Sequence, residues 1–254
     1  MSNLGTAEVG ITKPMGVAKS TRPRVLAVML TKDRPEMAAR AVRCFRTQTY
    51  ENKRLFVLDT GRERFQVKQE DGVYAKYFQR GMPQTIGGLR NEANSYGSPA
   101  CLGADIICHF DDDDLSHPRR IEEQVALLES SGKECVGYND MLFCRYGAPI
   151  QVWRYRLPLP GYALGTSLCY WRRAWARNPF PDKSNGEDWG FLKGVSCKSE
   201  TAVHQPIMGC EVMAPRMIAT IHGGNTATRL DPSKSEWTRE LEWDKRVREI
   251  LERA

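Results

Sequence analysis

An apolar segment that ends in acidic residues occurs three times in this chain. Residues 24–30 (RVLAVML) run into a turn with Asp33, residues 55–58 (LFVL) run into Asp59, and residues 105–110 run into four consecutive aspartates. Nearly continuous apolar runs of this length are typical of strands buried on both faces of a parallel sheet. Because ligands of open α/β sheets bind at the carboxyl ends of the strands, the three turns predict a polar site at one edge of such a sheet.

Helical patterns separate these strands. Pro35 begins a segment whose apolar residues Met37, Ala41, Cys44 and Phe45 share one helix face. Further helices are expected at 89–96, 118–130 and 172–177, and further strands at 74–78, 136–144, 152–155 and 217–221. Trp237, Leu241, Val247, Ile250 and Leu251 mark a C-terminal amphipathic helix. We therefore expect a flexible tail over 1–22, one α/β domain over 23–228 and a C-terminal helix over 229–254.

Composition narrows the class of protein. The chain has 254 residues, 41% of them hydrophobic and 27% charged, as in ordinary globular domains. The sequence contains neither a run of 18 apolar residues nor a signal-peptide pattern, so we expect a cytoplasmic protein. Its eight cysteines lack metal-binding spacing and are expected to be reduced. The net charge of +6 is compatible with a phosphate-rich partner.

The run Asp111-Asp112-Asp113-Asp114 is unfavourable unless a cation lies among its carboxylates. It follows a strand directly, and Pro118 and a helix come soon after it, so the carboxylates are held at a rigid corner. Carboxylate oxygens without nearby thiolates favour Mg²⁺ or Mn²⁺. An acidic turn on the surface is the alternative interpretation. The position of the run favours a site for Mn²⁺ or Mg²⁺.

Residues 110–118 (FDDDDLSHP) resemble the signature of glycosyltransferase family 2, an apolar strand followed by Asp-x-Asp-Asp, three variable residues and proline. Other segments resemble motifs of that family and stand in its order: TKDRP (31–35), TQTY (47–50), VLDTG (57–61), GGLRN (87–91), GEDW (186–189) and IHGGNT (221–226). Each motif is weak alone, but together they cover roughly residues 23–228.

The resemblance implies a GT-A fold, an α/β architecture with a single mixed, mostly parallel sheet flanked by helices and a Rossmann-like nucleotide-binding half. It also implies an inverting, hexosyltransferase-like enzyme, in which an acceptor hydroxyl attacks the anomeric carbon of a nucleotide sugar. The expected donor is a UDP-sugar. The compact chain is also similar in length to phage-like glycosyltransferases, those of bacteriophages and prophages. If the protein is encoded by a phage, its expected location is the host cytoplasm.

The resemblance further assigns the catalytic parts. Asp113 would ligate the metal, and Asp111 would bind the ribose, or the metal through water. His222 would complete the metal or diphosphate site, because a neutral imidazole can ligate Mn²⁺. Asp188 would be the general base that takes the acceptor proton, with Glu187 as the second candidate.

Nucleotide binding is expected in the turns after the first two strands and in the second helix. The residues that resemble this part of the site are Thr31, Asp33, Arg34, Asp59 and Arg90. Asp112 and Asp114 would have supporting roles in donor binding; solvent exposure and a helix N-cap are the alternatives. Asp59-Thr60 departs from the family, in which a second acid is frequent at this point, and this leaves the identity of the nucleotide open.

Acceptor binding is predicted around Trp153 and Trp189, because aromatic and basic residues alternate over 153–175 and aromatic faces stack on sugars or bases. The acceptor would be a saccharide or a lipid-linked glycan. Hydroxymethylated bases of phage DNA are the alternative acceptor, and core packing is the alternative role of the aromatic residues. A catalytically inactive nucleotide-sugar-binding module and a nucleotidyltransferase are the alternative classes of protein.

Overall fold

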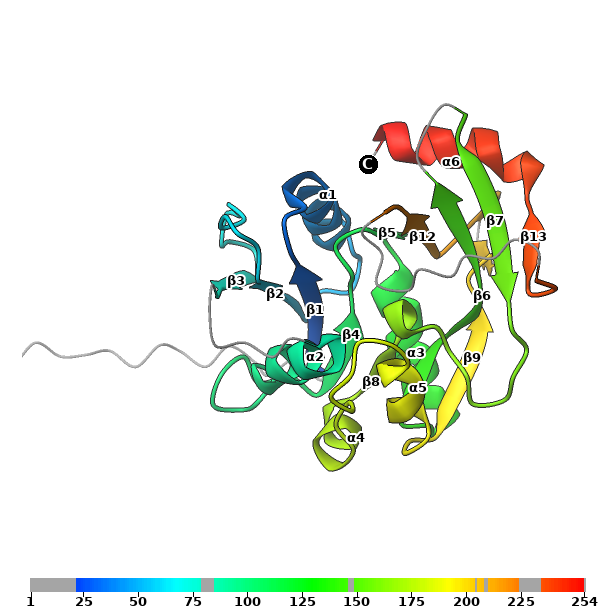
Figure 1. The fold of residues 1–254 in the computed structure, drawn as a ribbon. Helices are drawn as coiled ribbons and strands as arrows, with labels where there is room; N and C mark the ends of the chain where they lie inside the picture. The colour runs from blue at the N-terminus through cyan, green and yellow to red at the C-terminus, as the bar shows by residue number, and fades with distance from the viewer. Residues whose placement is uncertain are drawn as a thin grey trace, which may run out of the picture.

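A computed structural model describes residues 22–78, 85–145, 149–203, 205–207, 210–223 and 234–253. Except for Arg22, the predicted N-terminal tail lies outside this part of the chain. Figure 1 shows the first strands and helices on one side of the molecule and most of the later strands on the other, with the short strands β5 (Leu115–Ser116) and β12 (Met217–Ile221) between them.

Four parallel strands form the first half of the sheet. They are β1 (Val25–Thr31), β2 (Lys53–Asp59), β3 (Val73–Tyr77) and β4 (Ile106–His109). Their spatial order is β3-β2-β1-β4, so β1 lies in the middle with β2 and β4 as parallel neighbours. This order is the one expected of a Rossmann-like half. Thr31 and Asp59 are register partners at the carboxyl ends of β1 and β2, so the turns after these strands start side by side.

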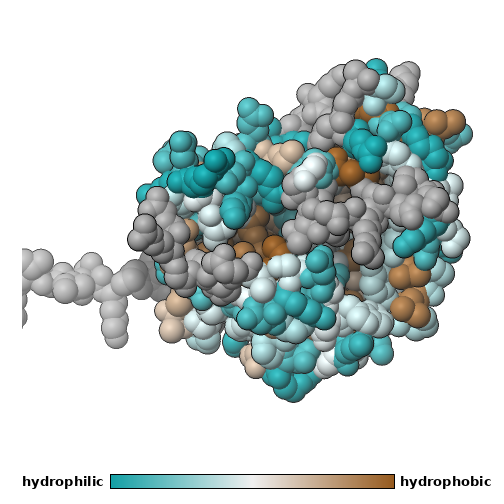
Figure 2. Space-filling view, in the orientation of Figure 1, coloured by the Kyte–Doolittle hydropathy of each residue, from teal (hydrophilic) through white to brown (hydrophobic). Residues whose placement is uncertain are grey.

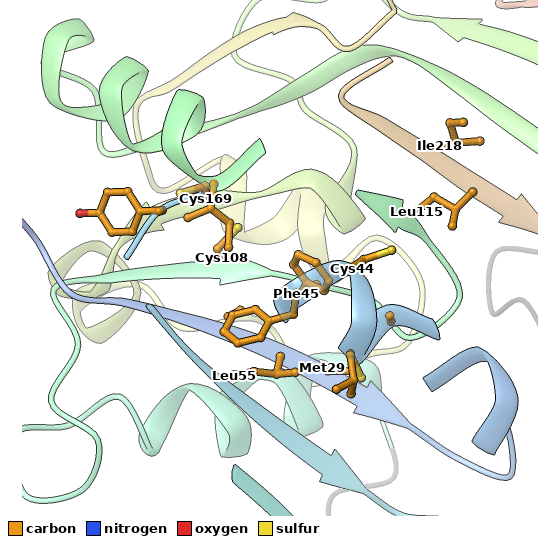
Figure 3. Packing of buried hydrophobic residues seen from close by; sticks show 14 of the residues in the cluster. Met29, Cys44, Phe45, Leu55, Cys108, Leu115, Cys169 and Ile218 are labelled. Atoms are coloured by element: carbon orange, nitrogen blue, oxygen red, sulfur yellow. The ribbon is translucent and has the colours of Figure 1, made fainter. Parts of the chain in front are cut away.

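Helices cover both faces of this half because the residues of β1 alternate between two cores. Val25, Ala27 and Met29 pack with Phe45 of α1 (Pro35–Arg46), in a cluster that also contains residues of α3 (Arg120–Ser131) and of α6 (Leu241–Arg253). Figure 3 shows Met29, Phe45 and Leu55 within this core. Leu26 and Val28 face the opposite cluster, to which α2 (Ile86–Ser95) and α5 (Glu187–Leu192) contribute.

The second half of the sheet is largely antiparallel. Beyond β4 come β8 (Cys169–Trp171), β6 (Cys135–Arg145), β7 (Gln151–Arg156) and β13 (Trp237–Arg239), each antiparallel to its predecessor. Strands β9 (Cys197–Thr201) and β12 (Met217–Ile221) run parallel to β6, and β5 (Leu115–Ser116) pairs with β12. A separate hairpin is formed by β10 (Gln205–Ile207) and β11 (Cys210–Ala214). One mixed sheet flanked by helices confirms the predicted fold class.

The C-terminal segment differs from the expected single helix. Trp237–Arg239 form β13 on the open edge of β7, and α6 begins only at Leu241. Trp243 and Val247 of α6 are buried in the first core cluster, which fastens the segment to the sheet. The remaining short elements are α4 (Arg172–Arg177) and a 3-10 turn at Gly165–Ser167. None of the helices in the described ranges has both the length and the apolar character that a bilayer span requires. The cysteines with described side chains are all free thiols.

Candidate active site

The acidic run lies between β4 and β5, and each of its four carboxylates has different partners. Asp111 faces Arg90 of α2, whose Nη1 and Nη2 lie 3.4 and 3.5 Å from its two carboxylate oxygens. Burial opposes ionisation of Asp111, but the charge of Arg90, together with the charge of His109 and hydrogen bonds from Arg90 and Thr166, outweighs it and holds the pKa of this carboxyl below its ordinary value. The same guanidinium, through Nε, lies 3.7 Å from Oε1 of Glu187. Arg90 therefore connects the acidic run with the GEDW motif.

Asp112 points toward the turn after β1. The Thr31 hydroxyl donates to its Oδ2 at 2.7 Å, and Nη2 of Arg34 lies 2.7 Å from its Oδ1. Burial, reinforced by the negative charge of Asp113, raises the pKa of Asp112 to about 7. Three of the residues predicted to bind the nucleotide sugar, Thr31, Arg34 and Asp112, thus form one connected group.

Asp113 and His222 lie side by side, and both contact the guanidinium group of Arg34. Oδ2 of Asp113 lies 2.9 Å from Nε2 of His222, and the Nη1 nitrogen of Arg34 lies 2.9 Å from the first atom and 3.2 Å from the second. Adjacent ligands of an octahedral ion with bonds of about 2.1 Å are separated by about 3 Å, so the two side chains fit a shared divalent metal. No group of three or more potential ligands surrounds one point among the described residues. Two protein ligands suit an ion that is completed by substrate phosphates and water.

Asp114 faces the interior of the fold. Its Oδ2 accepts a hydrogen bond from the Thr166 hydroxyl, and its Oδ1 accepts one from the Thr220 backbone N–H at 3.2 Å. Burial and the negative charges of the neighbouring aspartates raise the pKa of Asp114 well above its ordinary value. Asp114 therefore joins β5 and β12 at the corner, and it does not cap a helix.

A buried arginine supports this corner, and the sequence patterns gave no indication of it. Arg120, in the first turn of α3, is fully buried. Its guanidinium donates to the Ser116 hydroxyl and to the His109 carbonyl, both at 2.8 Å, and to the Thr166 carbonyl at 3.3 Å. It therefore ties together the strand before the acidic run, the strand after it and the 3-10 turn. Its positive charge also favours ionisation of Asp114.

The predicted base and the acidic run line one cavity of about 330 Å³. Asp188 enters it from the first turn of α5, and its Oδ1 accepts the backbone N–H of Trp189 at 2.7 Å. Glu187 and Arg90 lie beside it in the same wall. Burial raises the pKa of Glu187, opposed by the charge of Arg90. In Figure 2, hydrophobic residues are recessed near the centre of the face shown and are bordered by hydrophilic ones.

Asp33 and Asp59 shape the turns after β1 and β2. Asp59 is buried, and its two oxygens accept the backbone N–H groups of Gly61 and Phe65 at 2.9 and 2.6 Å. Asp33 has a φ of 55° and accepts the Arg62 backbone N–H at 2.7 Å; this hydrogen bond is the main reason that its pKa is lowered. Both carboxylates lie at the predicted strand ends, but neither is among the residues that line the cavity.

The tryptophans predicted to bind the acceptor lie outside the cavity. Trp153 is only 7% exposed, with the guanidinium groups of Arg145 and Arg239 stacked 5.3 and 5.2 Å from its ring centroid. Trp189 is exposed and contacts the Tyr162 ring. Within the described part of the chain, the aromatic residues that line the cavity are Phe143, Tyr155 and Trp237. Of these, only Tyr155 belongs to the aromatic and basic segment noted in the sequence.

His117 provides a test of how the corner after the acidic run is packed. Its Nδ1 accepts the Arg119 backbone N–H at 3.2 Å. Burial, with the charges of Arg216 and Arg119, lowers its pKa to about 4. As the pH falls, the His117 imidazole is protonated in the unfolded chain, near pH 6.5, before it is protonated in the folded protein. The stability that neutral His117 contributes is therefore present above about pH 6.5 and is lost as the pH falls through about 4. We expect His117→Gln to flatten the fall in unfolding free energy over this range, as measured by urea denaturation.

Asp112 and Asp114 have raised pKa values and change stability in the opposite sense, decreasing it as the pH rises. The test therefore compares the variant with the wild-type chain at each pH. Parallel stability profiles for the two proteins would show that His117 titrates normally and would refute this account of the corner.

Comparison with known proteins relates the chain to glycosyltransferases. No family model matches the sequence. EpsE of Bacillus subtilis (strain 168), whose name assigns it provisionally to the glycosyltransferases, is 28% identical over 158 residues, which are 58% of this chain and 54% of that protein. The chain thus spans about half the length of this curated relative.

Solved structures share the fold. TarS of S. aureus, residues 1–349 in complex with UDP-GlcNAc, superposes with a TM-score of 0.55 at 11% identity, covering 82% of this chain and 62% of that one. The mannosyltransferase PcManGT of Pyrobaculum calidifontis, in complex with GDP-Man and Mn²⁺, gives 0.53 at 12% identity, covering 80% and 57%. The fold is therefore the GT-A fold of these glycosyltransferases, as the sequence predicted.

Proposed function

We propose that this protein transfers a sugar from a nucleotide-sugar donor to an acceptor hydroxyl with inversion at the anomeric carbon. The observation that carries the proposal is that Asp188 and the acidic run line one cavity at the carboxyl ends of parallel strands. The relationship to EpsE and the fold shared with TarS and PcManGT support the same class of reaction. UDP is the proposed nucleotide, by analogy with the TarS complex.

Asp113 and His222 would hold Mn²⁺ or Mg²⁺ in this proposal. When bound, the ion would neutralise the charge that develops on the leaving diphosphate. Arg34 contacts both side chains and would have to release them to the ion. Because its guanidinium also pairs with Asp112, it can keep a position beside the diphosphate. Asp111, aligned by Arg90, would face the ribose or a water on the metal.

Donor recognition would also involve the turns after β1 and β2. Thr31 would act there together with Asp112, to which its hydroxyl donates a 2.7 Å hydrogen bond. The carboxylates of Asp33 and Asp59 already accept backbone N–H groups and so order the turns after β1 and β2. These two residues would therefore contribute to binding of the nucleobase and the ribose by shaping the turns. Arg90 would hold the diphosphate in this proposal, and its ion pairs with Asp111 and Glu187 support a defined orientation of its guanidinium.

Asp188 would accept the proton of the attacking hydroxyl. Its Oδ1 accepts the N–H of Trp189, which fixes the rotation of the carboxylate and leaves Oδ2 for the acceptor. Its neighbour Glu187 is less suited, because its carboxylate is buried against Arg90. A base in this position allows one carboxylate to take the proton while the acceptor oxygen attacks in line.

Gly165 is predicted to be a critical neighbour of this base. A Cβ atom at this position would lie 2.8 Å from Oδ2 and 2.9 Å from Cβ of Asp188. Gly165→Ala should therefore displace the carboxylate and lower the turnover number by about 10²-fold, the loss that a 1 Å misplacement can cause. Donor affinity, measured by isothermal titration calorimetry, should stay close to that of the wild type. Normal turnover in this variant would place the base elsewhere.

A donor panel tests the proposed function. The protein would be incubated with UDP- and GDP-sugars and Mn²⁺, with and without EDTA, and candidate acceptors would be analysed by mass spectrometry. Glycans and hydroxymethylated DNA would both be included. We expect a hexose increment on one acceptor class that disappears with EDTA. Donor binding without any transfer or hydrolysis would support the alternative of an inactive nucleotide-sugar-binding module.

A further inference from the structure

Three aromatic rings from neighbouring strands form one wall of the cavity. They are Phe143 of β6, Tyr155 of β7 and Trp237 of β13, named here the aromatic wall. Tyr155 and Trp237 are register partners, with ring centroids 4.8 Å apart, and the Phe143 ring lies 4.9 Å from Trp237. The same cavity is lined by the acidic run and by Asp188. The wall therefore belongs to the space in which an acceptor would meet the donor.

The aromatic wall is a surface of the cavity and not a part of the core. All three side chains are partly exposed. Trp153, two residues before Tyr155 on the same face of β7, is instead buried, and two guanidinium groups lie over its ring. The flat faces of such rings bind the C–H groups of a sugar or the face of a nucleobase. An exposed aromatic surface inside a cavity is therefore suited to a ring-shaped ligand.

Asp188 lies close to this wall. Burial raises the pKa of both Tyr155 and Tyr162, and the negative charge of Asp188 raises each of them further. Asp188 also lies beside Gly165, where an added Cβ atom would come within 2.8 Å of its Oδ2, and Gly165 lines the cavity with Leu164. A ring held on the aromatic wall would therefore have its substituents near the proposed base.

The charges of the residues that line the cavity favour a neutral sugar ring over a nucleotide or a phosphorylated sugar. Six of its described lining residues are acidic, namely Asp111, Asp112, Asp113, Asp114, Glu187 and Asp188. The described basic residues that line it, Arg34 and Arg90, are already within ion-pair distance of these carboxylates. Among the described residues, the cavity therefore offers a phosphodiester or a sugar phosphate no basic side chain that is not already paired with a carboxylate, whereas a neutral sugar ring needs none.

We propose that the aromatic wall is the acceptor subsite and that it binds a neutral pyranoside ring whose hydroxyl group faces Asp188. This inference rests on the proposed glycosyl transfer and narrows the acceptor from any hydroxyl compound to an uncharged glycoside. The nucleic-acid alternative would need cations in the cavity that pair with phosphates.

Intrinsic tryptophan fluorescence tests the subsite without a donor. The full-length protein would be titrated with methyl pyranosides, with glucose 6-phosphate and with a hydroxymethylated oligonucleotide. We expect at least one methyl pyranoside to change the emission, and we expect glucose 6-phosphate and the oligonucleotide to bind more weakly. Tyr155→Ala should weaken glycoside binding by about tenfold, the loss expected when one aromatic contact is removed. Trp237→Phe should remove most of the emission change. Trp171→Phe is a matched change beside the opposite end of β4, and it should leave both the glycoside affinity and the emission change as in the wild type.

Donor hydrolysis, measured in parallel, separates this inference from the proposed function. Hydrolysis by the wild-type protein together with no glycoside binding, or with equal binding by wild type and Tyr155→Ala, would overturn the subsite alone. Tighter binding of the oligonucleotide or of glucose 6-phosphate would overturn the choice of a neutral acceptor. Glycoside binding that requires the wall, in a protein that cleaves no donor, would uphold the subsite and overturn the proposed function.

Discussion

Replacing Asp188 with asparagine is expected to slow glycosyl transfer by about 10²- to 10⁴-fold, the usual contribution of a general base. Asparagine has the same shape, and its Oδ1 can still accept the Trp189 N–H that aspartate accepts at 2.7 Å. The variant should therefore fold normally and bind donor with the affinity of the wild type. The turnover number in a steady-state assay and the donor dissociation constant from calorimetry provide the two measurements.

Glu187→Gln is the matched comparison, since it makes the same chemical change at the adjacent position. Glu187 lies 3.7 Å from Nε of Arg90, so its replacement should disturb the orientation of Arg90 and weaken donor binding more than it slows transfer. Near-normal turnover in Asp188→Asn together with a large loss of turnover in Glu187→Gln would contradict this assignment and would identify Glu187 as the general base.

Replacing Asp113 with asparagine should remove most of the metal dependence of the reaction. Charge stabilisation by a bound metal is worth several kcal/mol, so we expect about 10²- to 10³-fold lower turnover. Affinity for Mn²⁺ in the presence of UDP should fall in parallel, as measured by electron paramagnetic resonance of the free ion. The physical reason is that Oδ2 of Asp113 and Nε2 of His222, 2.9 Å apart, are the proposed protein ligands.

Asp105→Asn serves as the control for this change. Asp105 lies just before the other end of β4, where its Oδ2 accepts the Arg24 backbone N–H at 2.9 Å. The control should bind Mn²⁺ as the wild type does. If Asp113→Asn binds Mn²⁺ equally well, the ion is held elsewhere and the proposed role of the acidic run is wrong.

Strands β1, β2 and β4 of the parallel half were readable from local sequence because they are largely buried on both faces and appear as continuous apolar runs. In the second half, the expected strand at 217–221 coincides with β12, which is also buried along its length. The helix α5 was not predicted, since six residues that include Gly190 are too few for a helical period to be visible. Trp237 was assigned to a helix because its pairing with β7, more than 80 positions earlier, leaves no local pattern.

The site was predictable in its acidic parts and not in its other parts. Asp113 follows a recognisable strand, so its place at one edge of the sheet could be inferred, whereas Asp188 was indicated only by the resemblance of GEDW to a family motif. That Arg34 turns into the acidic run, and that Arg120 lies buried beneath it, depends on contacts across the fold. The aromatic wall likewise depends on the register of three strands, and therefore Trp153 was chosen where its neighbour Tyr155 lines the cavity.

The nature of the released nucleotide tests the central proposal most directly. Phosphorus-31 NMR of the wild-type protein with diamagnetic Mg²⁺, a UDP-sugar and a glycoside acceptor would follow every phosphate in the reaction. Cleavage between the anomeric carbon and the diphosphate predicts UDP as the only new phosphorus species, formed in proportion to the glycosylated product. Release of pyrophosphate would indicate nucleotidyl transfer, and an unchanged donor across the whole sugar panel would indicate a binding module; either result would contradict glycosyl transfer by this site.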